Sequence, residues 1–263
     1  MKILFLHTEN AGTSYIRMIQ YANYMRKVPG VEVAYSKWDK DKQTIANWED
    51  RAKDPAVIRD FAMLMHNADI AVCQTVATGG AVAMLCALQE VYKKPILAEC
   101  DDNHFDIPPY NPAFSMYRPG GECQRWAHYQ MRVSNGMIVS TDYLKKEFSP
   151  YSPKITVIPN GIDFAIWDTV KAPKPHTGIK IGWCGGGSHN EDIKSIEPVI
   201  HRILDKYKNV KFVITGGDVP KLKPHKRLKV YVSWSDILKY HPHLANLGFD
   251  IGIAQLLDNG FNR

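Results

Sequence analysis

The sequence has few cysteines and no long hydrophobic run, and both shortages restrict what the protein can be. Its five cysteines are odd in number and widely spaced, without a C-x-x-C pair, so neither a disulfide framework nor a zinc site is indicated. No stretch approaches the roughly 18 apolar residues of a membrane-spanning helix. The apolar run at residues 2–7 is too short for the core of a secretory signal. We therefore expect a reduced, cytoplasmic protein.

The overall composition shows no excess that would indicate disorder. Of the 263 residues, 45% are hydrophobic and 23% are charged, and this length suits one large domain or two of ordinary size. The formal net charge of +6 is compatible with an anionic nucleotide, a polyanionic acceptor or peripheral contact with an acidic membrane. It is equally compatible with a solvated surface that carries spare lysines. Charge alone therefore selects no partner.

Apolar strand-like runs alternate with amphipathic helix-like runs over residues 1–167. This alternation is typical of an α/β domain with a parallel sheet that is covered on both faces. We predict helices over 14–27, 55–67, 81–94, 123–135 and 141–148. The predicted strands are 2–7, 31–36, 69–74, 95–100, 136–140 and 154–159.

The pattern stops at residues 168–178, which contain Pro173 and Pro175 and have no periodicity, as expected of a linker. It then restarts over 179–263 with helices at 190–207 and about 234–247 and strands at 179–184, 210–217, 228–233 and 249–255. The sequence thus predicts two tandem Rossmann-like domains. Because the second stops after its fourth strand without a closing helix, we expect it to be incomplete and the chain to be shorter than its natural relatives.

Three glycines, Gly185 to Gly187, lie between the strand at 179–184 and the helix that follows. A turn without side chains lets a ligand approach the backbone, and free amides at a helix start attract an anion such as a phosphate. The alternative is that glycine only satisfies a tight turn.

Three segments together resemble retaining glycosyltransferases of the GT-B architecture, similar to glycosyltransferase family 4. They are residues 137–167 with the phrase "VIPNGID", the stretch "IGWCGGGSHNEDI", and the stretch "GFDIGIAQLLDNGFNR", where Gln255 replaces the usual proline. The resemblance implies transfer of a hexose from a nucleotide sugar, such as a UDP- or GDP-hexose, to an acceptor hydroxyl. It further implies retention of configuration, no cofactor and no metal. The acceptor class, whether glycan, lipid or another hydroxyl compound, stays open.

The resemblance also implies roles for particular residues of the second domain. The backbone amides of Gly185, Gly186, Gly187 and Ser188 would hold the donor pyrophosphate, and His189 would contact phosphate. Asp192, in the same first turn, could also contact phosphate or fix the loop, but it is more simply interpreted as an acid favoured by the helix dipole. Residues lining the sugar-phosphate pocket would be Asn259, Phe261 and Asn262, while the family's paired glutamates would lie beyond Arg263. Without those glutamates, the chain could be an inactive or noncatalytic sugar-nucleotide-binding module.

Two loops of the first domain follow predicted strand ends, where ligands of open parallel sheets bind. The first offers Asn10, Gly12, Tyr15 and Arg17 as acceptor or donor contacts. The alternative is that Ser14 caps a helix and that Arg17 is a surface residue.

The second loop contains Asp101, Asp102 and His104, which we expect to orient an acceptor hydroxyl, act as base or meet a sugar hydroxyl. A metal site made by these carboxylates and His104 is the less favoured alternative. Aromatic residues follow this loop and are expected mainly to pack, although a sugar or base could stack on them. They are Tyr110, Phe114, Tyr117, Trp126 and Tyr129.

Two further functions compete with the glycosyltransferase. A dinucleotide-dependent dehydrogenase is disfavoured because residues 182–187 lack the G-x-G-x-x-G spacing. A transferase acting on modified bases in viral DNA would use a basic cluster to hold phosphates. The candidate cluster is Lys221, Lys223, Lys226, Arg227 and Lys229, which is also compatible with a solvated loop.

Overall fold

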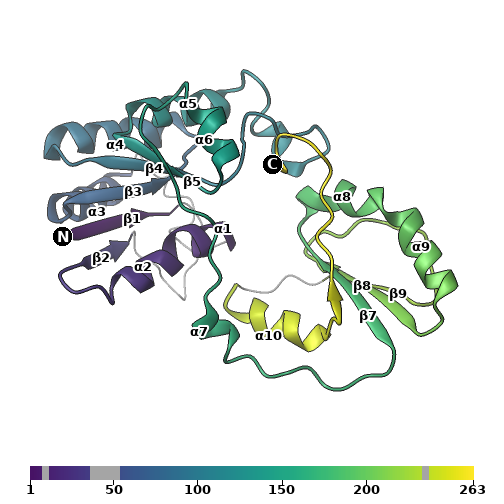
Figure 1. The fold of residues 1–263 in the computed structure, drawn as a ribbon. Coiled ribbons are helices and arrows are strands. Elements are labelled where there is room, and N and C mark those ends of the chain that lie inside the picture. Colours follow the sequence, from purple (N-terminus) through teal and green to yellow (C-terminus); the bar gives the residue numbers. More distant parts are fainter. Residues whose placement is uncertain (8–11, 36–53, 233–236) are drawn as a thin grey trace. The chain divides into compact units, whose positions relative to one another are not determined.

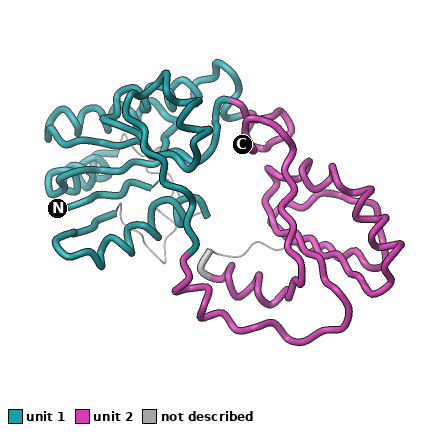
Figure 2. The backbone as a smooth tube through the Cα atoms, viewed as in Figure 1, with its two compact units in different colours: residues 1–105, 116–162 teal, residues 106–115, 163–263 magenta. Residues whose placement is uncertain are grey.

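The structure is a computed structural model, and it describes residues 1–7, 12–35, 54–232 and 237–263. These residues divide into two compact units, shown in different colours in Figure 2. Unit 1 comprises residues 1–105 and 116–162, and unit 2 comprises residues 106–115 and 163–263. The sequence places its first domain at 1–167, whereas the compact units divide after Ile162 and group residues 163–178 with unit 2.

Unit 1 is built on a parallel sheet in the order β2-β1-β3-β4-β5-β6, which confirms the predicted doubly wound arrangement (Figure 1). The chain moves from β1 to β2 on one side and then returns to place β3 on the other. The strands are β1 (Lys2–Leu6), β2 (Glu32–Tyr35), β3 (Ile70–Gln74), β4 (Ile96–Cys100), β5 (Gly136–Val139) and β6 (Ile155–Val157).

Helices cover both faces of this sheet because alternate strand residues point to opposite sides. Leu4 and Leu6 pack in the core formed with α3 and α4, whereas Ile3 and Phe5 pack against Met18 on the other face. Side chains of Asp54, Thr78 and Thr141 cap three of the helices. The helical elements are α1 (Gly12–Ser14), the π-helical turn η1 (Tyr15–Ile19), α2 (Gln20–Met25), α3 (Pro55–Asn67), α4 (Gly79–Tyr92), α5 (Glu122–Val133) and α6 (Asp142–Phe148).

Unit 2 has its own parallel sheet, in the order β10-β7-β8-β9. Its strands are β7 (Ile179–Cys184), β8 (Val210–Gly216), β9 (Leu228–Val232) and β10 (Ile251–Gly252). Figure 1 shows α8 and α9 on one side of this sheet and α10 on the other. The helical elements are η2 (Pro112–Ser115), α7 (Phe164–Trp167), η3 (Gly187–His189), α8 (Asn190–Ser195), α9 (Glu197–Lys206) and α10 (Ile237–Leu247).

Two predicted elements of unit 2 differ from the structure. The helix predicted over 190–207 is divided into α8 and α9 at Ile196, whose φ and ψ are −104° and 8°. Pro198 explains the division, because proline lacks an amide and clashes with the preceding turn, and it therefore begins a new helix. The strand predicted over 249–255 is shorter, with only Ile251 and Gly252 in the sheet.

Residues 168–178, the predicted linker, form no helix or strand. Part of this segment is nevertheless fastened to unit 2, because His176 Nε2 lies 3.0 Å from the carbonyl oxygen of Gly248. Among the described residues, no helix combines the length and the apolar character needed to cross a bilayer.

Candidate functional site

The strand order of the unit 2 sheet changes direction at β7. From β7 the chain adds β8 and β9 on one side and then returns to add β10 on the other. In open parallel sheets, ligands bind outside the carboxyl ends of the strands at such a switch point. Two segments leave these strand ends: the Gly-rich turn, residues 185–188, and the C-terminal segment, residues 253–263.

The Gly-rich turn is packed closely against the loop after β8. The Gly185 amide donates to the carbonyl oxygen of Thr215 at 3.1 Å. A side chain at Gly216 would overlap the Gly185 carbonyl oxygen, and a Cβ at Gly187 would lie 2.7 Å from Asp218 Oδ2. Gly186, in contrast, has open space on its Cβ side. Close packing therefore excludes a side chain at Gly216, whereas Gly186 leaves the turn accessible on its Cβ side.

Backbone donors are available at the accessible side of this turn. Within the described residues, the amides of Gly186, Gly187 and Ser188 have no hydrogen-bond acceptor. Consecutive free amides at the start of a helical segment suit an anion. The predicted phosphate-binding residues thus have geometry that fits an anion, and their role stays a prediction.

Asp192 connects the Gly-rich turn to the C-terminal segment. Its carboxylate is 1% exposed, and Oδ2 lies 2.7 Å from His189 Nδ1. Oδ1 accepts hydrogen bonds from the Leu257 amide at 2.8 Å and from Asn262 Nδ2 at 2.9 Å. The interpretation of Asp192 as only a helix-start acid is therefore wrong, because its side chain is buried and bonded to three other residues.

The predicted pocket residues of the C-terminal segment gather around this carboxylate. The backbone amide of Asn262 donates to Asn259 Oδ1 at 3.0 Å. The ring centroids of Phe261 and His189 are 6.1 Å apart. Asn259 Nδ2 in turn donates to the Tyr110 hydroxyl at 3.1 Å. The structure thus brings His189, Asn259, Phe261 and Asn262 into one cluster.

Tyr110 reaches this cluster from a distant part of the sequence. It belongs to residues 106–115, which leave unit 1 and pack in unit 2, where η2 contacts η3 of the Gly-rich turn (Figure 2). Burial raises the pKa of the Tyr110 hydroxyl, and the nearby carboxylates of Asp192 and Glu191 raise it further. We define the unit 2 site as the Gly-rich turn, His189, Asp192, Tyr110 and residues 257–262.

In unit 1, Asp101, Asp102 and His104 follow the carboxyl end of β4, as the sequence predicted. Burial raises the pKa of Asp101 to about 8, and the neighbouring Asp102 and Glu99 carboxylates add to this effect. Burial lowers the pKa of His104, whose ring is stacked on Tyr117 with centroids 4.5 Å apart. A carboxyl group whose pKa lies near neutrality suits proton transfer, and the roles of these residues stay predictions.

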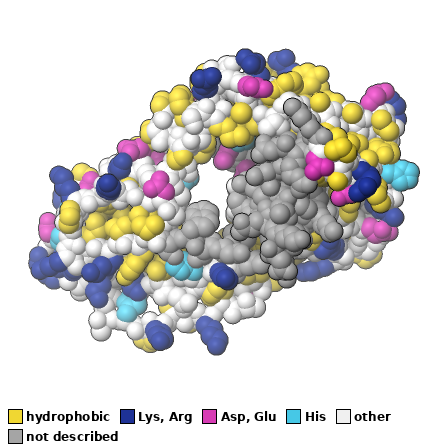
Figure 3. All heavy atoms as spheres, turned by 180° about the vertical axis from the view of Figure 1, so that it is seen from behind, with side chains coloured by type: hydrophobic (Ala, Val, Ile, Leu, Met, Phe, Trp, Pro, Cys, Tyr) yellow, Lys and Arg dark blue, Asp and Glu magenta, His cyan; other side chains and the backbone are white. Residues whose placement is uncertain are grey.

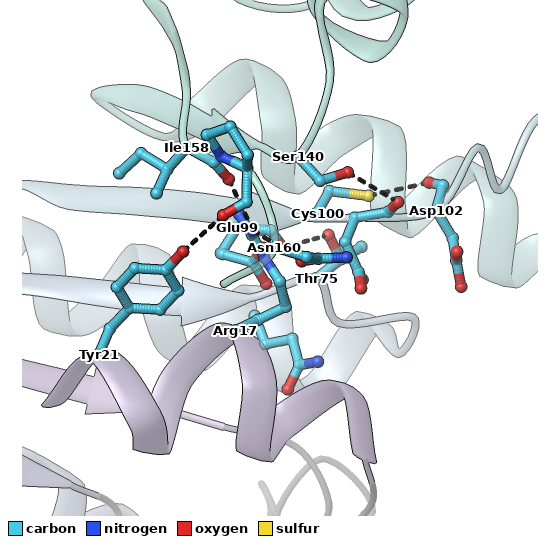
Figure 4. A network of polar contacts seen from close by, with 12 residues as sticks. Arg17, Tyr21, Thr75, Glu99, Cys100, Asp102, Ser140, Ile158 and Asn160 are labelled. Atoms are coloured by element: carbon cyan, nitrogen blue, oxygen red, sulfur yellow. Dashed lines mark hydrogen bonds and ion pairs between the residues drawn. The ribbon is translucent and has the colours of Figure 1, made fainter. Parts of the chain in front are cut away.

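Arg17 and Glu99 form an ion pair inside unit 1, with Arg17 Nε 2.6 Å from Glu99 Oε1 (Figure 4). Arg17 Nη1 donates to the Ile158 carbonyl oxygen at 2.6 Å and to Asn160 Oδ1 at 3.0 Å. The interpretation of Arg17 as a surface residue is therefore wrong. Its guanidinium holds the "VIPNG" segment, residues 157–161, beside the first helix, where Tyr21 also donates to the Pro159 carbonyl oxygen.

The other predicted residues of the first loop have different positions. Gly12 begins α1 and Tyr15 is buried, while Asn10 lies outside the described residues. Ser14 does not cap the helix, because its hydroxyl donates to Gln74 Oε1 at 2.7 Å instead. This bond joins the first helix to the end of β3.

No role was predicted for Glu99, and sequence reasoning left open whether Asp192 fixes the loop and whether Tyr110 packs or meets a ligand. A glutamate inside the apolar run "PILAEC" was a usable signal, because a charge in a buried strand needs a partner. No local signal could have placed Tyr110 in unit 2. Among the described residues, no cluster of three metal-ligating side chains occurs.

The basic cluster at residues 221–229 lies at the surface of unit 2. Lys221, Lys223, Lys226 and Lys229 are exposed, and they lead into β9, an edge strand. Figure 3 shows Lys and Arg side chains at the surface with acidic ones interspersed, which is also the pattern of an ordinary solvated surface.

No protein-family model and no curated protein matches the sequence. Solved structures match it through the fold. The catalytic domain of starch synthase IV from Arabidopsis thaliana bound to ADP and acarbose has a TM-score of 0.60 and 12% identity, covering 96% of this chain and 77% of that one. An alpha-glucosyltransferase in complex with UDP and a 13-mer DNA containing a central A:G mismatch has a TM-score of 0.59 and 12% identity, covering 98% and 73%.

A UDP-GlcNAc 2-epimerase from Neisseria meningitidis bound to UDP-GlcNAc has a TM-score of 0.52 and 13% identity, covering 92% of this chain and 74% of that one. At such identities the likeness concerns the fold alone. The chain spans about three quarters of the length of these solved chains. The chain therefore has the α/β fold of two Rossmann-like units that characterises the GT-B architecture.

Proposed function

We propose that this chain binds a nucleotide sugar at the unit 2 site and transfers the sugar to an acceptor hydroxyl. The observation that carries the proposal is the row of free amides at Gly186, Gly187 and Ser188, located at the switch point of a GT-B fold. The neighbours named with bound UDP and ADP support it, because a diphosphate is the group these amides would suit.

We assign candidate roles in each unit separately. In unit 2, the amides of the Gly-rich turn would stabilise the leaving diphosphate without a metal or a cofactor. In unit 1, Asp101, Asp102 and His104 would orient the acceptor hydroxyl, with an ionised carboxylate as candidate base.

For a retaining transfer, the bond between the anomeric carbon and the diphosphate oxygen breaks, and the acceptor oxygen bonds to the same face of that carbon. The acceptor proton passes to the leaving phosphate oxygen. The step needs no enzyme nucleophile.

Calorimetric titration with UDP, GDP, ADP and their hexose conjugates tests the proposal, with and without Mg²⁺. We expect saturable binding without the metal. Gly186→Asp should reduce affinity by more than about tenfold, because it places a carboxylate against the phosphate. Gly186→Asn is the matched control, since it has nearly the same size but no charge and should bind more tightly than Gly186→Asp. Absence of binding to all the nucleotides would contradict the proposal.

An activity assay addresses whether the chain is a noncatalytic binding module. If it binds a nucleotide sugar but is noncatalytic, incubation with an acceptor panel of glycans, lipids and DNA releases no free nucleotide and produces no glycosylated acceptor. Release of nucleotide together with glycosylated acceptor identifies a transferase. Conversion of the free nucleotide sugar to an epimer, without an acceptor, would instead indicate the chemistry named for the epimerase neighbour.

The exposed cluster at Lys221, Lys223, Lys226 and Lys229 favours DNA as one acceptor to be tested. Phosphate neutralisation by these side chains would make DNA binding weaken steeply with salt. Fluorescence anisotropy with a DNA duplex at several salt concentrations measures this. An affinity that is unchanged when all four lysines are replaced by glutamine would exclude the cluster as a DNA contact.

A further inference from the structure

We propose that the free edge of β9, together with the lysines around it, binds an extended acidic peptide of a partner protein as an additional strand. This surface lies outside the residues of the unit 2 site, so the inference does not depend on nucleotide binding. β9 is the edge strand of its sheet, with β8 on one side and no strand of the described residues on the other (Figure 1). The backbone groups at such an edge can pair with another chain.

The register of the sheet shows which backbone groups of β9 are available. In β8, Phe212 donates its amide to the Arg227 carbonyl oxygen at 2.9 Å, which fixes the phase of the parallel ladder. The backbone of Lys229 therefore also faces β8, whereas the amide and carbonyl groups of Val230 and Val232 point away from the sheet. An added strand can bond to these two residues without breaking any bond between β8 and β9.

The apolar side chains of β9 are highly exposed for residues of a sheet. Val230 is 43% exposed, Tyr231 49% and Val232 75%. Val230 and Val232 share a face with Leu228, which packs against the core of unit 2. Natural edge strands usually avoid exposed apolar side chains, because these favour pairing with another chain. One face of the edge therefore offers apolar surface to an added strand.

The opposite face of this edge is basic. Lys229 and Tyr231 lie on it, because successive side chains of a strand alternate between the faces. Lys211 of β8 lies on the same face, since Val213, two residues further along, is paired with Lys229. The loop before β9 adds three exposed lysines, Lys221, Lys223 and Lys226. Among the described residues, no ion pair neutralises any of these lysines.

The two faces determine the chemistry of the partner. In a strand added to β9, alternate side chains lie beside Lys229 and the others lie beside Val230 and Val232. A segment in which acidic residues alternate with apolar ones satisfies both faces. A second copy of this chain suits the surface less, because it brings two basic clusters together. DNA is attracted by the lysines but cannot form a backbone ladder with β9.

Fluorescence anisotropy with a fluorescein-labelled peptide of alternating glutamate and valine tests the proposal. We expect saturable binding that weakens as salt is added, since exposed charges are screened. A peptide of the same composition with its glutamates grouped at one end should bind at least about tenfold more weakly, because it cannot match both faces. Lys229→Glu should weaken binding of the alternating peptide by about tenfold or more, since it places like charges together.

Val230→Pro tests the contribution of the backbone. Proline removes the outward amide of Val230 and leaves the bonds to β8 in place, as edge strands tolerate. Binding of the alternating peptide should weaken more than about tenfold. Val33→Pro is the matched control in β2, the edge strand of the other sheet. There the Glu32 amide bonds to the Met1 carbonyl oxygen, so the backbone of Val33 faces outward, and peptide binding should not change.

Circular dichroism and urea denaturation establish whether each proline variant is folded. If proline unfolds unit 2, Lys229→Glu and the grouped peptide decide the question without it. Absence of saturable binding of the alternating peptide overturns the proposal. So does unchanged affinity in a folded Val230→Pro variant.

Two further results would assign the surface to another occupant and overturn the acidic peptide. The first is equal affinity for the alternating and grouped peptides, with both displaced by duplex DNA, because this is the behaviour of a general polyanion site. The second is a dimer in sedimentation equilibrium that Val230→Pro dissociates, because it places a second copy of the chain on β9.

Discussion

Arg17 and Glu99 form an ion pair whose two side chains are each 1% exposed. Removing one partner leaves an uncompensated charge in the interior, so Glu99→Ala should lower the free energy of unfolding by about 3–5 kcal/mol. Urea denaturation measures this change. The control is Glu32→Ala, which breaks the exposed Lys2–Glu32 pair and should cost at most about 1 kcal/mol. Equal losses in both variants would contradict a structural role for the buried pair.

The raised pKa of Asp101 should make the free energy of unfolding depend on pH. Its pKa in the folded chain is raised to about 8 by burial and by the Asp102 and Glu99 carboxylates, whereas an unfolded aspartate ionises near about 4. Between these values the folded chain binds more protons, so the free energy of unfolding should fall as pH rises and level off above about 8. In Asp101→Asn this fall should be shallower.

Urea denaturation at pH 5, 6, 7 and 8 provides the measurement for Asp101. The control is Asp106→Asn, an exposed aspartate shortly after the same loop, which should leave the slope of the unmodified chain unchanged. If Asp101→Asn has the same slope as the unmodified chain, Asp101 is ionised in the folded protein and the proposed proton-transfer role loses its support.

Among the elements, β7 and β8 lie so close together that the Gly-rich turn depends on a glycine in the neighbouring strand. Gly216 ends β8 directly against the Gly185 carbonyl oxygen, so Gly216→Ala must displace the Gly-rich turn. We expect a loss of about 1–3 kcal/mol of unfolding free energy, together with weaker nucleotide binding. Gly252→Ala is the matched control, because a Cβ at that strand position meets no atom within 4 Å. The two are compared by urea denaturation and calorimetry. Equal effects of the two substitutions would show that neither stability nor nucleotide binding requires the close approach of Gly216 to Gly185.

For the molecule as a whole, each unit has a separate hydrophobic core. The core of unit 2 includes Leu204, which is 0% exposed, on the buried face of α9. Leu204→Ala should destabilise unit 2 by about 2–5 kcal/mol and accelerate amide exchange in β7 and β8. Exchange in β3 and β4 of unit 1 should not change. Hydrogen-exchange mass spectrometry measures both.

Val199→Ala is the matched control for this prediction, since Val199 lies on the same helix and is 39% exposed. It should have little effect on either unit. Faster exchange in β3 and β4 of Leu204→Ala would show that the two units unfold as one cooperative body.

The sequence by itself was sufficient to predict the α/β class, the sheet strands and most of the helices, because apolar periodicity is a local property of the chain. It also located the Gly-rich turn, since the exclusion of side chains at a strand-to-helix connection requires glycine there. The helix predicted over 190–207 is divided at Ile196. Pro198 is a local signal for this division, but the spacing of apolar residues does not register it.

Only the tertiary structure decided how the two candidate sites are held together. The Arg17–Glu99 pair joins residues 82 positions apart, the Asp192–Leu257 bond spans 65 positions, and the Asn259–Tyr110 bond spans 149. Residue type predicts that a buried charge needs a partner, but not which one, because the partner is chosen by the packing of strands and loops. The position of Tyr110 in unit 2 follows from that packing, and no local pattern encodes it.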